Sequence, residues 1–303
     1  MTIETAQRAG NAVLVGIGLM LLGVFVFSFN NGLGKWVIGA MPVGEFLFLR
    51  GLLALVLLAP FFWRAGLAPI RTAPRKGLQL VRILLSAVEI AMFYWALSYL
   101  PLADTMTFWL ATPIYVTALS ALFLGEKVGW RRWTAVAVGF LGVVLAVRPS
   151  GATIGWPALI GVTGGILYAF VLIATRSLRS TSDIVLVSGS LAGSMILGLI
   201  MTSFSVVVVP GLADFGLITV IAILFIVGAI LSNRSLKHAP ASVVVPFQYT
   251  QIIWGVLLGY FLFGDVPEIT TLVGAAIITG AGIYIFMREK SVGKREPVPI
   301  EPP

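Results

Sequence analysis

The stretch from Ala12 to Asn30 reads AVLVGIGLMLLGVFVFSFN and holds no charged residue over its 19 positions. A helix needs about 20 apolar residues to cross the hydrocarbon core of a bilayer, so this stretch predicts a membrane-spanning helix. Nine further apolar segments, bounded by charge, proline or glycine, follow it: Val43 to Phe62, Gln79 to Tyr99, Leu102 to Leu124, Arg132 to Val147, Trp156 to Thr175, Ser182 to Phe204, Asp214 to Leu231, Pro240 to Phe263 and Ile269 to Met287.

All ten segments are predicted to be helices. A backbone exposed to lipid must satisfy its own hydrogen bonds, and no alternating strand pattern of the kind found in membrane barrels occurs. One patch fits less simply: Ser205 to Pro210, Ser-Val-Val-Val-Val-Pro, either extends the seventh segment or forms an interfacial loop. The fold class is therefore an all-α polytopic membrane protein with ten transmembrane helices.

Composition excludes several other classes of protein. Of the 303 residues, 59% are hydrophobic and only 11% are charged, which is far too apolar for a soluble domain. The chain has no cysteine and a single histidine, His238, so we expect no disulfide, no metal site and no cofactor. No stretch reads G-x-x-x-x-G-K-[ST], so no ATP-driven motor is encoded.

The distribution of Lys and Arg predicts the orientation. In the ten-helix interpretation, all but three of the 20 basic residues fall on one side of the membrane. The exceptions are Lys35 and Arg148 on the opposite side and Arg50 inside a span. Because cytoplasmic loops carry the basic excess, both termini are predicted to be cytoplasmic. The net charge of +8 is then explained by topology, and no nucleic-acid partner is expected.

An internal repeat divides the chain into two halves. An offset of 139 residues without a gap pairs Pro101 with Pro240, Phe108 with Phe247, Ile114 with Ile253, Leu119 with Leu258 and Gly125 with Gly264. Five helices per half is an odd number, so the second half enters the membrane from the opposite side, as in the inverted repeats of secondary transporters. The predicted parts are a cytoplasmic N-terminus (1–11), a first repeat (12–149), a second repeat (150–287) and a cytoplasmic tail (288–303).

Three motifs resemble a known family. They are Glu45-Phe-Leu-Phe-Leu-Arg50-Gly-Leu-Leu-Ala, then Ala96-Leu-Ser-Tyr-Leu-Pro101-Leu-Ala, and Leu124-Gly-Glu126 before a glycine-rich segment. The pattern is similar to the EamA family of the drug/metabolite transporter superfamily, over essentially the whole chain in two copies. The resemblance implies a ten-helix carrier of the bacterial inner membrane. Members of the family export amino acids and other metabolites, and some branches import riboflavin or S-adenosylmethionine.

Charged residues within lipid cost about 2.5 to 3.5 kcal/mol each at a helix centre, so each asks for an explanation. Arg50 and Glu89 lie at similar depths in the second and third spans, and we expect an ion pair or a water-bridged contact between them. Their role is either to orient the two helices or to couple protons and contact substrate. Glu45, near the end of its span, is expected to be a hydrated rim residue.

The fourth and ninth spans are both interrupted by a proline, Pro113 and Pro246, and paired discontinuous helices are the best sequence indication of a binding site at the midplane. At the 139-residue offset, Trp109 corresponds to Gln248 and Thr112 to Gln251. The two residues of each span are three apart and share a helical face. We expect Trp109, Thr112, Gln248 and Gln251 to face a central cavity, with the two glutamines as interhelical contacts being the alternative. Tyr168 and Asn30 are weaker candidates.

Pairs of small residues four apart predict close helix packing: Gly161 with Gly165, Gly189 with Gly193, Ala135 with Gly139, and Ala276 with Gly280. Whether one of these faces serves a homodimer is left open. The acidic residues Glu126 and Asp265 follow equivalent spans, where each either caps the next helix or pairs with a nearby base.

These observations predict a secondary carrier for a small molecule in the lipid bilayer, not an enzyme. A membrane enzyme needs a convergent nucleophile, acid and base, and the interior offers chiefly Arg50 and Glu89. A channel is the other alternative, although no ring of like charges is evident. Few charges, several aromatic rings and amide side chains suit a neutral or zwitterionic planar solute. Riboflavin uptake, which the resemblance brings in, is placed slightly ahead of amino-acid export.

Overall fold

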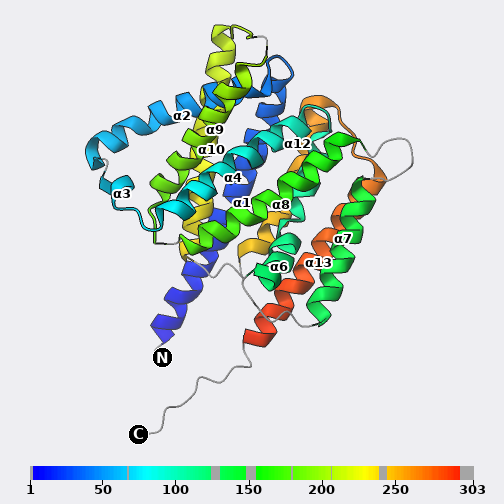
Figure 1. Ribbon diagram of the computed structural model, residues 1–303. Helices are drawn as coiled ribbons and strands as arrows, with labels where there is room; N and C mark the ends of the chain where they lie inside the picture. Colours follow the sequence, from blue (N-terminus) through cyan, green and yellow to red (C-terminus); the bar gives the residue numbers. More distant parts are fainter. Residues whose placement is uncertain are drawn as a thin grey trace.

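The computed structural model describes residues 3–66, 68–123, 130–147, 155–178, 180–205, 207–238 and 244–293, and every regular element in these ranges is helical (Figure 1). The elements are α1 (Ile3–Ile38), α2 (Val43–Ala65), α3 (Ala68–Arg71), α4 (Lys76–Leu97), α5 (Leu102–Leu110), α6 (Thr112–Phe123), α7 (Trp130–Val147), α8 (Trp156–Ser177), α9 (Asp183–Thr202), α10 (Leu212–His238), the 3-10 helix η1 (Val245–Thr250), α12 (Gln251–Phe263) and α13 (Ile269–Gly293). The all-helical prediction is confirmed for these residues.

Within the described ranges, six helices are long and apolar enough to cross a membrane: Val13–Ile38, Val43–Arg64, Lys76–Leu97, Trp156–Thr175, Asp183–Thr202 and Leu212–Ser235. Three shorter apolar helices accompany them: Trp133–Leu145, Phe247–Phe263 and Ile269–Tyr284. The chain is therefore a multi-pass membrane protein. Of the features predicted from sequence, Arg148, the Gly125 to Lys127 loop and the tail from Lys294 onwards lie outside the described residues.

The fourth span is interrupted near Pro113, and the ninth changes helix type after Pro246. α5 ends at Leu110 and α6 begins at Thr112, with Ala111 between them in a turn. Proline has no backbone N–H, so Pro113 cannot donate to the carbonyl of Trp109 four residues earlier. The hydroxyl of Thr112 donates to that carbonyl instead, at 2.5 Å. In the second half, the tighter 3-10 helix η1 contains Pro246 and leads directly into α12.

Two details differ from the expectations. α1 continues beyond Asn30 to Ile38 through Gly32 and Gly34, which disfavour a helix but, unlike proline, do not prevent one. Glu45 is not a hydrated rim residue: it is 4% exposed, and its Oε2 accepts a hydrogen bond from the backbone N–H of Val208 at 2.9 Å. Val207 to Pro210 are not helical, so of the two alternatives for the Ser205 to Pro210 patch the structure has the loop.

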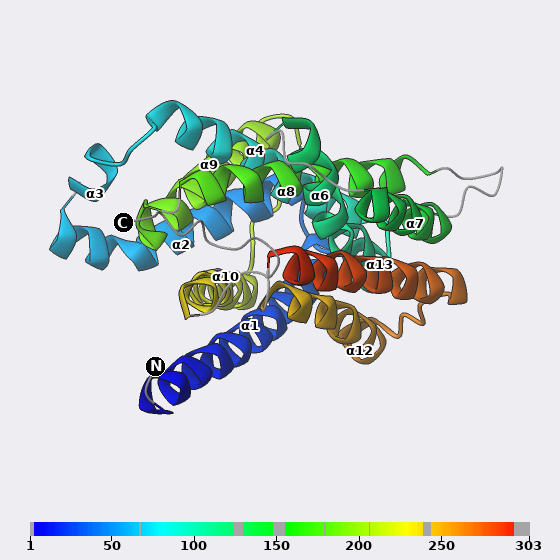
Figure 2. The ribbon, with the colours of Figure 1, turned by 90° about the horizontal axis from the view of Figure 1, so that it is seen from below.

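Helices from different parts of the chain pack side by side in antiparallel pairs. α1 lies along α10, α2 along α9, α4 along α8, and α7 along α13; the last pair lies side by side in both views (Figures 1 and 2). Small residues permit these approaches, since Gly161 and Gly165 face Phe108, and Gly189 and Gly193 face Ile83. Gly280 has open space beside it, so the Ala276 and Gly280 face is not a packing face in the described part of the chain.

Candidate substrate-binding cavity

A cavity of about 290 Å³ lies among α1, α2, α4, α5, α8, α9, α10, η1 and the start of α12. The residues predicted from sequence to form the site converge on it: Arg50, Glu89, Trp109, Tyr168, Gln248 and Gln251 all line its wall. Thr112 does not line it. Its side chain is 2% exposed, and its hydroxyl is used at the break between α5 and α6.

Glu89 is held by a tryptophan across the cavity wall. The indole Nε1 of Trp109 donates to Glu89 Oε1 at 2.7 Å, and both side chains are buried. The Trp109 ring packs edge-on against Phe93, with ring centroids 4.8 Å apart. On its other side, a Cβ atom at Gly164 would lie 2.6 Å from the Trp109 ring. A glycine on α8 therefore leaves the room in which Trp109 reaches Glu89.

Arg50 and Glu89 form no direct ion pair, because each has a different partner. The guanidinium of Arg50 is enclosed by the rings of Phe46, Tyr94 and Phe225, at 5.0 to 5.6 Å from their centroids. Such contacts stabilise a cation where no carboxylate is present. A water-bridged contact between Arg50 and Glu89 stays a prediction.

Arg50 also begins a chain of hydrogen bonds that crosses the bundle. Its Nη1 donates to the Tyr94 hydroxyl at 3.2 Å, and that hydroxyl donates to Asn30 Oδ1 at 3.2 Å. Asn30 Nδ2 then donates to the carbonyl of Ile221 at 2.7 Å. The chain joins α2, α4, α1 and α10, so it couples four helices around the cavity. It also explains how Asn30, a weaker candidate in the sequence, comes to line the cavity wall.

Arg82 is a cavity residue that the sequence analysis missed, since it was counted among the basic residues of the cytoplasmic side. It is 9% exposed and lines the cavity from α4. Its Nε donates to Thr175 Oγ1 at 2.8 Å, and its Nη1 donates to the carbonyl of Leu186 at 3.1 Å and to Ser190 Oγ at 3.2 Å. The available signal was its position: Arg82 stands within the apolar run from Leu80 to Leu85, not in a loop.

Gln248 and Gln251 line the cavity from η1 and α12. In the described part of the chain, neither amide side chain makes a hydrogen bond with another helix. An amide that faces a cavity and has no partner within the bundle is available to a ligand or to water.

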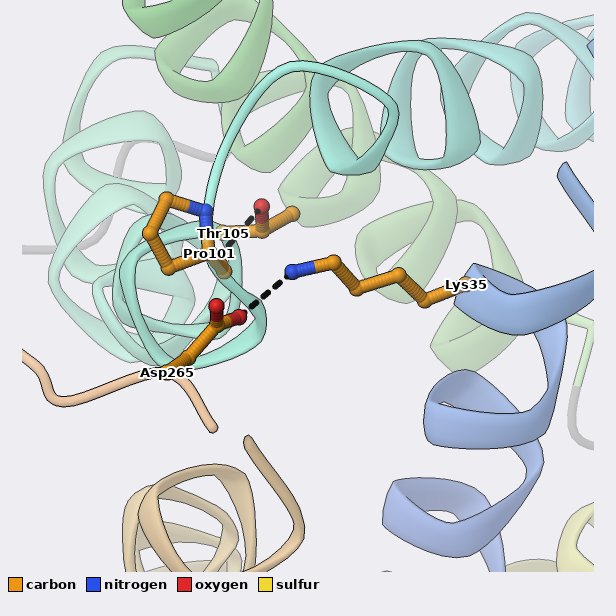
Figure 3. A network of polar contacts seen from close by, with 4 residues as sticks. All are labelled: Lys35, Pro101, Thr105 and Asp265. Carbon is orange, nitrogen blue, oxygen red and sulfur yellow. Dashed lines mark hydrogen bonds and ion pairs between the residues drawn. The ribbon is translucent and has the colours of Figure 1, made fainter. Parts of the chain in front are cut away.

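The cavity occupies one half of the bundle. Its lining residues run through the middle of α4, from Arg82 to Phe93, and from there the cavity extends toward the beginning of α9 and the ends of α8 and α10. The opposite end is crossed by an ion pair: Lys35 Nζ, near the end of α1, lies 2.6 Å from Asp265 Oδ2. Figure 3 shows the Lys35 side chain reaching from α1 to Asp265, beside the first turn of α5 at Pro101 and Thr105.

Gly264 brings Asp265 to this position. It ends α12 in the left-handed conformation, with φ 69° and ψ 12°, and its N–H donates to the Tyr260 carbonyl at 3.0 Å. Glycine adopts this conformation without strain, which is why it commonly follows the last helical residue. The ammonium of Lys35 also lies over the ring of Phe263, 4.8 Å from its centroid. Of the two roles expected for Asp265, the structure has the pairing with a base.

A membrane-spanning helical bundle with a polar cavity among its helices is the architecture of a membrane transporter. Residues 14–148 match the family described as "EamA-like transporter family". A riboflavin transporter of Rhizobium johnstonii is 30% identical, over 96% of this chain and 97% of that protein. The chain belongs to the EamA family of the drug/metabolite transporter superfamily and is a membrane transporter.

Other relatives carry different substrates. A pseudopaline exporter of Pseudomonas aeruginosa is 28% identical, over 91% of this chain and 97% of that protein. An S-adenosylmethionine uptake transporter of Rickettsia bellii is 26% identical, over 91% and 94%. A solved crystal structure shares the fold with a TM-score of 0.63 at 17% identity, covering 93% of this chain and 99% of that chain.

Proposed function

We propose that this protein is a secondary carrier of the bacterial inner membrane that moves a small organic solute by alternating access. Its two inverted five-helix halves are residues 12–149 and 150–287, and both termini are cytoplasmic, with residues 1–11 and 288–303 as the terminal segments. The observation that carries the proposal is the cavity, because charged side chains of the first half and amide side chains of both halves line one space inside an apolar bundle.

The pairing of the helices supports an inverted repeat. Let the five spans of the first half be α1, α2, α4, α5–α6 and α7, and those of the second half α8, α9, α10, η1–α12 and α13. Exchanging the halves converts the contact of α1 with α10 into that of α8 with α4, and both contacts exist. The same exchange leaves the pairs α2 with α9, α5 with α12, and α7 with α13 unchanged. A pseudo-twofold axis requires this relation.

Alternating access is supported by the unequal ends of the bundle. In the predicted orientation, the cavity lies toward the cytoplasm, and the Lys35–Asp265 ion pair crosses the outer end. Lys35 belongs to the first half and Asp265 to the second. A salt bridge of this kind is weak when exposed to water. Its separation would therefore cost little if the halves tilt apart at that end.

Two observations bear on the solute. Aromatic rings in the cavity wall, among them Phe93, Trp109 and Tyr168, fit a planar solute, and the Rhizobium relative supports uptake of riboflavin or a similar vitamin. The charged groups Arg50, Arg82 and Glu89 instead favour a zwitterionic or acidic solute, such as an exported amino acid. The first measurement is uptake of labelled riboflavin by a riboflavin-requiring bacterium that expresses this chain.

A double variant, Gln248→Ala with Gln251→Ala, tests the cavity in the same assay. We expect it to lose uptake while still reaching the membrane. Gln79→Ala is the matched control, because the Gln79 amide donates to the Pro74 carbonyl outside the cavity. Accumulation that collapses with the proton gradient distinguishes a carrier from a channel. No uptake by well-expressed wild type discards riboflavin, and efflux of amino acids is then measured.

A further inference from the structure

The cavity wall carries more positive than negative charge. Among the described residues that line it, Arg50 and Arg82 are the cations, Glu89 is the carboxylate, and the rest are neutral side chains with the two phenols Tyr168 and Tyr249. None of the three charged groups pairs with another: Glu89 is bonded to an indole, Arg50 to a phenol, and Arg82 to two hydroxyls and a carbonyl. A buried charge without a counter-charge is costly, so the cavity is electrostatically complementary to an anion.

The guanidinium of Arg82 leaves one nitrogen for such an anion. Nε and Nη1 make all the hydrogen bonds of this side chain in the described part of the structure. Nη2 makes no hydrogen bond, and it is not fully buried. It is therefore reachable from the cavity that Arg82 lines. The contacts of Arg82 with α8 and α9 therefore leave Nη2 unused and facing the cavity.

The three existing hydrogen bonds also fix the direction of that donor. They tie Arg82 to Thr175 on α8 and to Leu186 and Ser190 on α9, so the guanidinium plane is held before a ligand arrives. A donor that is already in place costs less conformational entropy on binding. Arg50 also has an Nη2 without a hydrogen bond, but it is less suited to bind an anion, because three aromatic rings surround its guanidinium and its Nε is buried without a partner.

Glu89 stands far enough away to permit an anion at Arg82. The two residues lie seven positions apart on the same face of α4, which is about 10.5 Å along the axis at 1.5 Å per residue. Ser86 lies between them on that face and also lines the cavity. An anion at Arg82 is thus separated from the carboxylate of Glu89 by two helical turns, and repulsion over that distance is smaller than the attraction of Arg82 at contact distance.

We infer that Arg82 is the residue that binds a carboxylate of the transported solute, and that it thereby selects a carboxylate-bearing solute over its uncharged analogue. The inference rests on the proposed carrier function. A guanidinium and a carboxylate match in planar geometry and charge, which makes this contact both strong and selective.

The first test uses purified wild-type protein in detergent and measures thermal stabilisation by matched pairs of compounds. L-Phenylalanine is compared with L-phenylalaninamide, and succinate with succinamide, because each pair differs in the carboxylate. We expect an acid of the panel to stabilise the protein at a concentration about tenfold lower than its amide. Equal effects of acid and amide, or no effect of any carboxylate, overturn the inference. Inorganic phosphate is added as a separate arm, and stabilisation by phosphate alone also overturns it.

Variants locate the contact. Arg82→Gln is expected to abolish the preference for the acid, and Arg82→Lys to keep part of it, because the charge is retained without the planar fork. Arg64→Gln is the matched control, since Arg64 is exposed in the last turn of α2 and does not line the cavity. A preference that persists in Arg82→Gln contradicts the assignment. Riboflavin uptake without any acid preference would overturn the inference and leave the carrier function standing.

Discussion

Trp109 is the residue on which the buried carboxylate of Glu89 depends. Trp109→Phe keeps an aromatic ring against Phe93 but removes the Nε1 donor that lies 2.7 Å from Glu89. An unsatisfied buried acceptor costs about 1 to 3 kcal/mol. We therefore expect a lower unfolding temperature in detergent and weaker transport of whichever solute the wild type carries. Adding Glu89→Gln to this variant should recover part of the stability, because the amide carries no charge.

Trp156→Phe is the control for that experiment. Trp156 is 46% exposed and packs against Trp95 and Tyr99 away from the cavity, so its replacement should leave both measurements close to wild type. If Trp109→Phe has the unfolding temperature and the transport rate of the wild type, the hydrogen bond to Glu89 contributes to neither stability nor transport.

Much of the cavity wall can be predicted from sequence because polar groups are scarce in this chain. Glu89, Gln248 and Gln251 stand inside apolar runs, where facing the bundle interior is the low-energy arrangement. Their partners are less predictable. Nothing in the spacing says that Glu89 meets Trp109 instead of Arg50, because that choice depends on how α2, α4 and α5 are rotated about their axes.

Two glycines of the bundle offer a test of packing at the level of the helix. A Cβ atom at Gly164 of α8 would lie 2.6 Å from the ring of Trp109, whereas one at Gly280 of α13 meets nothing within 4 Å. Gly164→Ala is expected to push the ring away from Glu89 and to destabilise the protein by about 1 to 3 kcal/mol. Gly280→Ala should be neutral or slightly stabilising, since alanine is the better helix former. Thermal unfolding in detergent compares the two, and equal effects would contradict the packing argument.

Irregular geometry in the fourth and ninth spans agrees with the loss of a backbone donor at Pro113 and Pro246, although α2 continues through Pro60 without a break. The position of the Thr112 side chain, outside the cavity wall, could not be predicted from the sequence. Its spacing from Trp109 predicts a shared face and hence a place in the cavity, but the break at Ala111 turns its hydroxyl to the Trp109 carbonyl. Periodicity is a guide to side-chain direction only while the helix is regular.

The ion pair between α1 and the segment after α12 can be tested as a closure of the bundle. The chain has no cysteine, so Asn31→Cys places a single thiol on the cavity wall. In this background, Lys35→Ala removes the contact with Asp265, and we expect faster labelling by a membrane-impermeant maleimide added outside the cell. Exchanging the charges, with Lys35→Asp and Asp265→Lys, should slow labelling again. Lys76→Ala, at the start of α4, is the control, and an unchanged rate in Lys35→Ala would contradict the closure.

For the whole molecule, charge and hydropathy together predict more than either does alone. Hydropathy locates apolar segments but not their direction, and the Lys and Arg count supplies the direction. The same count hides Arg82, because a basic residue six positions into α4 is tallied with the loop before it. The electrostatics of the cavity therefore become visible only when the buried cations are separated from the surface cations.

The orientation is itself a testable prediction for the whole chain. Val209, between α9 and α10, is 88% exposed and is predicted to face outward, while Lys76 begins α4 on the cytoplasmic side. Because wild type has no cysteine, Val209→Cys and Lys76→Cys each carry one reactive thiol. In intact spheroplasts an impermeant maleimide should label Val209→Cys, and Lys76→Cys should react only after the membrane is permeabilised. The reverse labelling pattern would show that the bundle has the opposite orientation. The cavity would then extend toward the outside, and Lys35 and Asp265 would close the cytoplasmic end.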